Sequence, residues 1–435
     1  MKRTPLIPNP WNIFNLSASP YWQDPLGDSD QTHPLALFVG RSKELQRLLN
    51  LLHGAGESSS RQALAGDPGV GKTTLVKCFK ARALVEGYLT MDSFVPIVSG
   101  ETAEGLFGRV LGAVYDTILA NRPHTVDHDA MQAAQVLVRS AREGSRGGGI
   151  SILGVGATVS QSISTTSPRD MLLDGPRVLR DLLTLVQSSD ARGIVLHVNN
   201  LENLSDADTE RAGAILRDLR DPLLMHNGLH VIVVGTHEAV RSAISTHAQV
   251  RSTFSVVPLE ALPVNDVHAL LDHRYNHMRL DAKTAVIPPI EKRAITDLNE
   301  LFRGDLRGLL KAMEDGVTPN IGLSPITPGA RRSKVSSIRP LTFDQLRPTL
   351  QQQYAEDLAS LSEESRVRQL VAWGKRDPAA QHTQKALGAM WKVSQPAVSQ
   401  SLAYLVRQGY VAPLPRIGAE PRQYRLTGVS RLIFG

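Results

Sequence analysis

A short glycine-rich run constrains this chain more than any other feature of its sequence. The run reads Gly66-Asp67-Pro68-Gly69-Val70-Gly71-Lys72-Thr73 and fits the pattern G-x-x-x-x-G-K-[ST]. A predicted strand at 62–65 precedes the run and a helical pattern begins at Thr74, which is the context that this pattern requires. Glycines let successive backbone N–H groups face a phosphate, and the N-terminus of the following helix adds partial positive charge. The run therefore predicts a site for a nucleoside triphosphate, with ATP as the first candidate.

Two side chains of the run have predicted roles in phosphate chemistry. Lys72 is expected to reach the β- and γ-phosphates, and the hydroxyl of Thr73 is expected to ligate Mg²⁺. The predicted nucleotide-contacting residues of this segment are Gly66, Asp67, Pro68, Gly69, Val70, Gly71, Lys72, Thr73 and Thr74. ATP and Mg²⁺ are therefore the expected cofactors.

Hydrolysis needs more than this loop, because a carboxylate must hold Mg²⁺ and a base must align water. The predicted strand at 193–198 should supply both groups, but it continues into two amides, Asn199 and Asn200. An amide oxygen can contact Mg²⁺, which makes Asn199 a second candidate ligand, but an amide cannot accept a proton from water at neutral pH. Glu202 is the nearest carboxylate; it could substitute, or it could face elsewhere. We therefore predict a slow or partner-dependent ATPase.

Periodicity and composition divide the 435 residues into five parts. Short apolar segments alternate with helical patterns up to about residue 258, which indicates a parallel sheet covered by helices. The predicted parts are an extended N-terminal arm at 1–36, a nucleotide-binding core at 37–258, a helical lid at 259–317, a linker at 318–341 and a C-terminal domain at 342–435. Within the core, residues 144–167 are dense in Gly, Ser and Thr and predict a hairpin insertion or a flexible loop.

The C-terminal part carries three helical patterns followed by two short extended segments. Thr383 is placed to cap the second helix and Ser394 to cap the third, whose apolar face holds Val398, Leu402 and Leu405. This order is a helix-turn-helix with a wing, and it is similar to the winged-helix domains of bacterial and archaeal transcription regulators. By that resemblance, the DNA-contacting residues are Ser394, Gln395, Ser399 and Gln400 toward base edges, and Arg416, Arg422 and Arg425 toward phosphates or the minor groove.

The positive charge of the chain is concentrated in its C-terminal part. From residue 361 to the end there are eleven Lys and Arg against four Asp and Glu, a net charge of +7, while the whole chain carries +6. A basic domain on a nearly neutral body indicates a polyanionic partner such as duplex DNA. The alternatives are a solvated surface and a protein-interaction module, since the third helix carries only Arg407 near its end.

Three more segments complete a resemblance that runs from Phe38 to about Asp315. They are Phe38-Val39-Gly40-Arg41-Ser42-Lys43-Glu44-Leu45, Val231-Ile232-Val233-Val234-Gly235-Thr236 and Gly304-Asp305-Leu306-Arg307. With the glycine-rich run they resemble an AAA+ ATPase of the initiator and clamp-loader-like branch, which contains the origin-recognition proteins, and the related STAND ATPases. The resemblance implies an α/β P-loop NTPase fold with a helical lid. It also implies that Val39 lies beside the adenine, Thr236 near the γ-phosphate, and that Arg307 reports nucleotide state.

The sequence departs from that family at the arginine finger, the residue that many members insert into a neighbouring subunit's site. The family's Ser-Arg-Phe is here Ser252-Thr253-Phe254, with Arg251 as the nearest candidate. The identity of a finger therefore stays open, and so does the size of any oligomer. A second copy of the chain, or another ATPase subunit, remains a possible partner.

Two functions from different classes fit these patterns. The first is a nucleotide-switched DNA-binding protein, of replication-initiation, loading, transposition or defence type. The second is a STAND-like signalling or scaffold ATPase in which the winged helix is a protein-interaction module. We expect no membrane partner, because no run of 18 apolar residues is present. The lone Cys78 and the polar N-terminus without a secretory pattern favour the cytoplasm.

Overall fold

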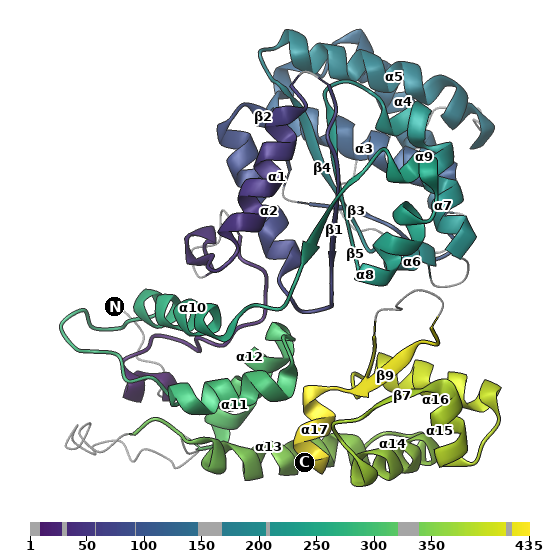
Figure 1. Ribbon diagram of the computed structural model, residues 1–435. Coiled ribbons are helices and arrows are strands. Elements are labelled where there is room, and N and C mark those ends of the chain that lie inside the picture. Colours follow the sequence, from purple (N-terminus) through teal and green to yellow (C-terminus); the bar gives the residue numbers. More distant parts are fainter. Residues whose placement is uncertain are drawn as a thin grey trace.

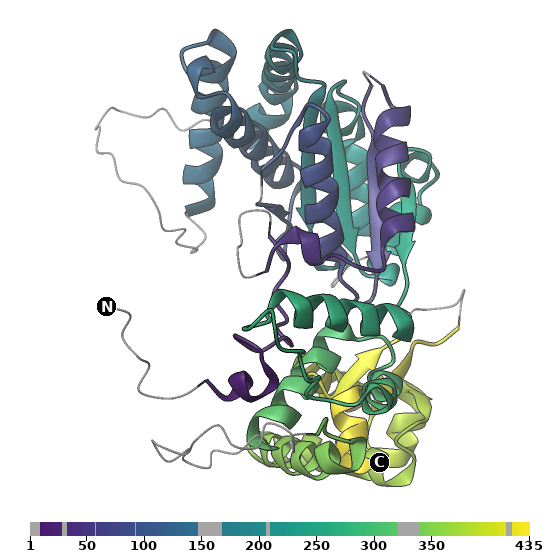
Figure 2. The same ribbon diagram turned by 90° about the vertical axis from the view of Figure 1, so that its left-hand side faces the viewer.

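The computed structural model describes residues 9–27, 33–56, 58–91, 93–146, 168–205, 209–320, 339–414 and 420–435. Figure 1 shows an α/β core at the top, with helices on both sides of the sheet, and a lower layer made of the lid and the C-terminal domain. Figure 2, turned by 90°, shows the same two layers, with α10 between the sheet and the rest of the lower layer. The predicted class, a parallel sheet with a helical lid, is confirmed.

The core is built on a parallel sheet in the order β2-β4-β5-β1-β6, with β3 also pairing with β4. β2 and β3 share one edge, because Tyr88 is in register with Gly193 and Val95 with Val198 at opposite ends of β4. The strands are β1 (Arg61–Gly66), β2 (Tyr88–Leu89), β3 (Val95–Pro96), β4 (Gly193–Asn199), β5 (Leu229–Gly235) and β6 (Ser255–Leu259). Burial on both faces explains why the central strands read as nearly continuous apolar runs.

Alternate residues of the strands face two different layers of helices. Leu64 packs in a cluster with α1 and α2, whereas its neighbours Ala63 and Ala65 pack in a cluster with α3, α4, α5 and α7. The helices of the core are α1 (Ser42–Gly54), α2 (Lys72–Val85), α3 (Ala103–Asn121), α4 (Asp129–Arg146), α5 (Pro168–Ser188), α6 (Glu202–Ser205), α7 (Thr209–Asp218), α8 (His237–Val240) and α9 (Ala248–Arg251). Short turns of other helical type occur at η3 (Pro123–Thr125), η4 (Arg220–Leu224) and η5 (Arg241–Ser245).

The N-terminal arm packs onto the lid and completes its hydrophobic core. The lid helices are α10 (Val264–His277), α11 (Lys292–Phe302) and α12 (Leu306–Asn320), and the arm contributes the short turns η1 (Pro10–Phe14) and η2 (Leu35–Leu37). The buried guanidinium of Arg274 donates hydrogen bonds to the carbonyls of Pro20 and Trp22, at 3.0 and 2.8 Å, and lies 3.9 Å from the centre of the Trp22 ring. Burial lowers the pKa of Arg274 to about 9. The arm is therefore fixed to α10 by a cation–π contact and two hydrogen bonds.

The C-terminal domain follows the predicted order of helices and hairpin. Its elements are α13 (Phe343–Ala359), α14 (Glu364–Arg376), β7 (Gln381–Thr383), α15 (Gln384–Trp391), α16 (Gln395–Arg407), β8 (Val411–Pro413), β9 (Gln423–Leu426) and α17 (Gly428–Phe434). The three strands form an antiparallel sheet in the order β7-β9-β8. α17 approaches the lid so closely that a Cβ on Gly428 would overlap the ring of Phe302. This glycine lets the domain dock on the lid (Figure 1).

Several local predictions need correction. β3 is only two residues long, and β2, β6, β7 and α17 were not predicted from the sequence. Residues 144–146 form the last turn of α4 instead of a hairpin, and 147–167 lie outside the described residues. Thr383 does cap α15, its hydroxyl accepting from the Ala386 N–H at 3.2 Å, whereas Ser394 occupies the N-cap position of α16 without a side-chain hydrogen bond. Among the described residues, no helix is long and apolar enough to cross a membrane.

A buried histidine in the sheet predicts acid sensitivity. His197 on β4 is 3% exposed, and burial, with a smaller contribution from Lys80, lowers its pKa to about 3. The unfolded chain binds a proton below pH 6.5 that the folded chain excludes, so folding stability falls as the pH drops from about 6.5 towards 3. When the pH is lowered from 7.5 to 5, the free energy of unfolding of His197→Leu is expected to fall by about 2 kcal/mol less than that of the parent. Urea unfolding followed by circular dichroism measures this difference.

The exposed His273 provides the control. His273→Leu should retain the pH dependence of the parent. An equal loss of stability in the parent and in His197→Leu would contradict the assignment of His197 as a neutral buried group.

Candidate functional site

The glycine-rich loop connects β1 to α2 and curls around its own lysine. Gly69 and Gly71 have φ angles of +82° and +95°, a left-handed conformation that favours glycine. α2 begins at Lys72, whose ammonium donates to the carbonyl oxygens of Gly66 and Asp67 at 2.7 and 2.9 Å. The backbone thus has the wrapped form that presents N–H groups to a phosphate, and the lysine lies at its centre.

The remaining loop residues lie around this lysine. Pro68 is exposed, Val70 is buried in the core, and Thr73 and Thr74 are half-buried in the first turn of α2. A Cβ on Gly66 would lie 2.8 Å from the Leu259 carbonyl oxygen, so this glycine permits the close pairing of β1 with β6. All predicted residues of the loop therefore come together in one place.

Arg41 is a residue of this site that sequence reasoning missed. Its side chain is 5% exposed and donates to the carbonyl oxygens of Val70, at 3.1 Å, and Glu260, at 2.6 Å. It therefore ties the loop to the end of β6. Arg41 could have been found from the sequence, because it lies in the segment 38–45 that resembles the family's adenine-contacting box. Only Val39 of that segment was assigned a role. Val39 itself is half-buried and packs against the core of the lid.

The end of β4 brings Glu202 next to Lys72. Asn200 has a φ of +66°, so the chain turns sharply after Asn199, and α6 begins at Glu202. Burial lowers the pKa of Lys72, and the Glu202 carboxylate is the largest electrostatic contribution that opposes this shift. The buried Oε2 of Glu202 has no hydrogen-bond partner in the part of the chain that the structure describes. Of the two orientations that the sequence left open, Glu202 takes the one that faces the loop.

Thr236 lies at the end of β5 and caps α8. Its side-chain oxygen accepts a hydrogen bond from the Ala239 N–H at 3.1 Å, while its own O–H remains a donor. β5 is the neighbour of β1 in the sheet, and Ala65 of β1 is in register with Gly235. The sheet therefore places this hydroxyl at the same edge as the loop.

The lid reaches the loop through the turn that precedes α12. A Cβ on Gly69 would overlap the Oδ1 atom of Asp305 and lie 3.5 Å from the Cβ of Arg307. Asp305 Oδ1 also accepts from the Gly308 N–H at 3.0 Å, which caps α12, and burial raises the pKa of its carboxyl. Arg307 is exposed beside it. The predicted sensor arginine is therefore adjacent to the phosphate loop.

The predicted DNA-contacting residues separate into two groups. The residues of α16, namely Ser394, Gln395, Ser399 and Gln400, are all exposed. Arg422 instead forms an ion pair with Glu238 of α8, and Arg425 is half-buried on β9. Arg416 lies outside the described residues. The finger candidate Arg251 is exposed at the end of α9.

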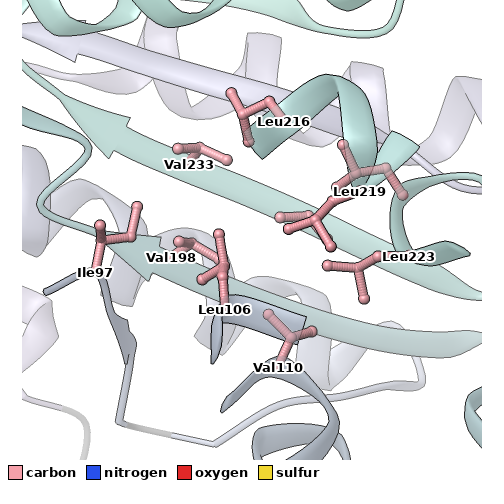
Figure 3. A pocket seen from close by; sticks show the side chains of 10 residues that line it. Ile97, Leu106, Val110, Val198, Leu216, Leu219, Leu223 and Val233 are labelled. Atoms are coloured by element: carbon pink, nitrogen blue, oxygen red, sulfur yellow. The ribbon is translucent and has the colours of Figure 1, made fainter. Parts of the chain in front are cut away.

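A small apolar cavity lies elsewhere in the core. Its lining comes from the α3 side of the sheet and includes Ile97, Val198, Leu216 and Val233, whose aliphatic side chains converge in Figure 3. Only aliphatic side chains line it, so it offers nothing to a phosphate or a metal ion. We assign it to core packing.

The nucleotide-binding core is similar to a known protein family. Residues 37–234 match the family described as "AAA ATPase domain". This part of the chain is similar to AAA ATPase domains. It contains the glycine-rich loop, Glu202 and all of β5 up to Val234, and its family implies nucleotide binding. A comparison with curated proteins found no match.

Solved structures with similar chains include two proteins of Aeropyrum pernix and one of Pyrococcus abyssi. The Aeropyrum pernix ORC1 protein in complex with DNA is 14% identical, with a TM-score of 0.44 and coverage of 91% of this chain and 92% of that one. The Aeropyrum pernix ORC2 protein, in ADPNP–ADP complexes, is 14% identical with a TM-score of 0.46 and 95% coverage of each chain. A Walker-type ATPase of Pyrococcus abyssi is 12% identical with a TM-score of 0.47 and coverage of 95% and 99%.

The donor set of the AAA ATPase domain fits a magnesium-bound triphosphate. Carboxylate, hydroxyl and amide oxygens are ligands that Mg²⁺ accepts, so Glu202, Thr73 and Asn199 would be the residues to hold it. Glu202, whose buried Oε2 has no hydrogen-bond partner among the described residues, would supply the carboxylate that the amide pair lacks. Bound Mg²⁺ would neutralise phosphate charge. The sequence identifies Glu202 as the nearest carboxylate. The direction of its side chain could not be predicted, because it depends on the left-handed conformation of Asn200.

This placement predicts the effect of one substitution on hydrolysis. Glu202→Gln keeps the shape of the side chain but removes its charge and its capacity to accept a proton. We expect the kcat of ATP hydrolysis to fall by about 100-fold, while the nucleotide dissociation constant stays within about threefold of the parent. Asn200→Asp is the companion variant, because it restores one family carboxylate. A Glu202→Gln protein that hydrolyses ATP at the parent rate would exclude Glu202 as the base.

Proposed function

We propose that this protein binds ATP with Mg²⁺ and uses its nucleotide state to control its assembly and its binding to duplex DNA through a C-terminal winged helix. The observation that carries this proposal is the ion pair between Arg422 of the C-terminal hairpin and Glu238 of the ATPase core. Glu238 lies on α8, which Thr236 caps at the edge of the phosphate loop. The ATPase core and the C-terminal domain are therefore in direct contact, through a helix that begins at this edge of the sheet.

Nucleotide binding starts from the preformed loop. In the structure the Lys72 ammonium is satisfied by two backbone carbonyls of its own loop. A triphosphate would take over this ammonium, because a charge-assisted bond to phosphate is stronger than a bond to a neutral carbonyl. Thr73 and Thr74 would follow at the helix N-terminus, where partial positive charge favours the phosphates.

The lid then reports what the loop holds. Because Asp305 and Arg307 lie against Gly69, a phosphate entering the loop changes the charge that both side chains face. The arginine gains a partner and the carboxylate gains a neighbour of like charge. This opposite effect on two adjacent lid residues would shift the lid turn, and with it the docked C-terminal domain, when the nucleotide changes.

Binding of duplex DNA is proposed for the exposed N-terminal half of α16. Its core face, with Val398, Leu402 and Leu405, is buried, while Ser399 and Gln400 point away from that core and are exposed. Short polar side chains of this kind can donate to and accept from base edges in the major groove. Arg422 and Arg425 would contact DNA only after leaving the positions that they hold in this structure.

A second function is favoured by the docking of the C-terminal domain. α13 and α17 pack directly on α11 and α12 of the lid, as Gly428 and Phe302 illustrate, so the domain already serves as a packing module within the chain. A signalling or scaffold ATPase would use this packing to hold an inactive state. Exposed Arg251 would then contact a second copy in the active assembly.

Binding of fluorescent duplex DNA, measured with and without ATP at two salt concentrations, tests the proposal. We expect ATP to change the affinity of the parent but not that of Lys72→Ala, and we expect binding to weaken steeply with salt. Ser399→Glu/Gln400→Glu places two negative charges against the phosphates and should lower the affinity by about tenfold or more. Gln132→Glu/Gln135→Glu, on the exposed face of α4, is the matched control.

Two results would count against the proposal. Equal DNA affinity with and without ATP would show that the two domains are not coupled. Absence of DNA binding in the parent, together with ATP-dependent assembly in sedimentation, would favour the signalling or scaffold function instead.

A further inference from the structure

Part of the C-terminal domain lies against the lid turn that contacts the phosphate loop. The contact runs through the lid turn at 303–305, which touches the phosphate loop at Gly69 on one side. On the other side, Arg303 donates to the carbonyl oxygen of Ala379 at 3.5 Å, just before β7 begins at Gln381. Gln381 is in register with Arg425 of β9. The strand that carries Arg425 therefore runs beside the lid turn.

The alternation of β9 explains why Arg425 is half-buried. Tyr424 and Leu426 are buried in the core of the C-terminal domain, so Gln423 and Arg425 occupy the opposite face of the strand. Gln423 is exposed on that face, whereas Arg425 is only partly accessible. Burial lowers the pKa of Arg425, while the carboxylates of Asp67 and Asp305 act against that shift. The guanidinium therefore lies within the electrostatic reach of both the loop and the lid.

An ion pair holds the start of the hairpin strand in this position. Arg422, one residue before β9, pairs with Glu238 in the first turn of α8. The pair joins the hairpin to the ATPase core independently of the lid. Two separate contacts, one to α8 and one to the lid turn, thus fix the strand that carries Arg425.

The charges around this contact do not balance. The cationic groups are Lys72, Arg303, Arg307, Arg425 and Arg431, and the carboxylates that face them are Asp67, Glu202 and Asp305. Arg431 on α17 is 7% exposed, its Nε atom finds no partner among the residues that the structure describes, and burial with the charges of Arg303 and Arg425 lowers its pKa to about 10. Five cations against three carboxylates leave an excess of positive charge in a partly desolvated place. An anion would relieve this repulsion.

We propose that Arg425 is a further phosphate-contacting residue of the nucleotide site, contributed by the C-terminal hairpin, and that Arg422 is a positioning residue that acts through Glu238. The ligand group is the terminal phosphate of a nucleoside triphosphate, whose oxygens accept a bidentate pair of hydrogen bonds from a guanidinium. The inference rests on the proposed binding of ATP. The inference adds a residue of the C-terminal domain that binds a nucleoside triphosphate but makes no contact with a diphosphate.

This assignment has a consequence for the C-terminal domain. A guanidinium that holds the terminal phosphate cannot also bind a DNA phosphate, so the two uses of Arg425 exclude each other. The triphosphate would hold the hairpin on the core, and loss of the terminal phosphate would free it. The same hairpin arginine thereby couples the nucleotide to the accessibility of the domain.

Titration calorimetry on the full chain, with a non-hydrolysable ATP analogue and with ADP as separate ligands, tests the proposal. Arg425→Ala should raise the dissociation constant of the triphosphate analogue by about tenfold or more, because a charge-assisted contact is lost. Its dissociation constant for ADP should stay within about threefold of the parent value. Arg425→Lys, which keeps the charge but not the fork, should give an intermediate value.

The positioning role of Arg422 has its own variants. Arg422→Ala and Glu238→Ala should each raise the dissociation constant of the triphosphate analogue by a smaller factor, about threefold. The exchanged pair Arg422→Glu/Glu238→Arg should restore most of the affinity, which a purely structural loss would not do. Arg368→Ala is the control, because Arg368 is exposed and pairs with Glu364 on its own helix, α14. Circular dichroism confirms folding of each variant.

The outcomes separate this inference from the proposed function. A parent that binds neither nucleotide would remove the proposed function and the inference with it. A parent that binds both, together with unchanged triphosphate affinity in Arg425→Ala and Arg425→Lys, would overturn the inference alone. An equal loss of affinity for ADP and for the triphosphate analogue would also overturn it, because the contact would then not be to the terminal phosphate.

Discussion

The close approach of the lid turn to Gly69 is the constraint on which the rest of the structure depends. A glycine at this position leaves space for the carboxylate of Asp305, and no side chain could fill that space. The same carboxylate caps α12, so the start of that helix is fixed by a residue that lies against the phosphate loop. The lid is thereby held at the loop, and the N-terminal arm and the C-terminal domain, which both pack on the lid, are brought there with it.

This constraint makes the nucleotide site a place where three parts of the chain meet. In our proposals, the ATPase core contributes Lys72 and Glu202, the lid contributes Arg307, and the C-terminal hairpin contributes Arg425, which Arg422 positions. A change of one phosphate charge in such a site acts on all three parts at once. Our proposals on DNA binding and on Arg425 both depend on the closeness of these charged groups. They also explain why the chain can have two amides where the family has two carboxylates. A site that senses phosphate can work with slow turnover.

The sequence predicts features that depend on a short segment better than features that depend on contacts between distant segments. The phosphate loop, the central strands and the helices α14 to α16 could be predicted, because each follows from spacing within a short segment. β6 could not be, since its burial comes from pairing with β1, nearly 200 residues away. Glu202 and Arg425 show the same limit: periodicity gives the face of a helix or strand but not what covers it. The hairpin arginines therefore suggested a free DNA-binding surface, whereas Arg422 contacts the core.

Amide hydrogen exchange on the full chain tests the central claim most directly. The claim is that a triphosphate in the loop changes how the C-terminal domain is held. With a non-hydrolysable ATP analogue and Mg²⁺, exchange in β9 and α8 should slow by about tenfold relative to the empty protein, and Lys72→Ala should show no such change. Protection of the phosphate loop and α2 alone, with unchanged exchange in β9 and α8, would contradict the account.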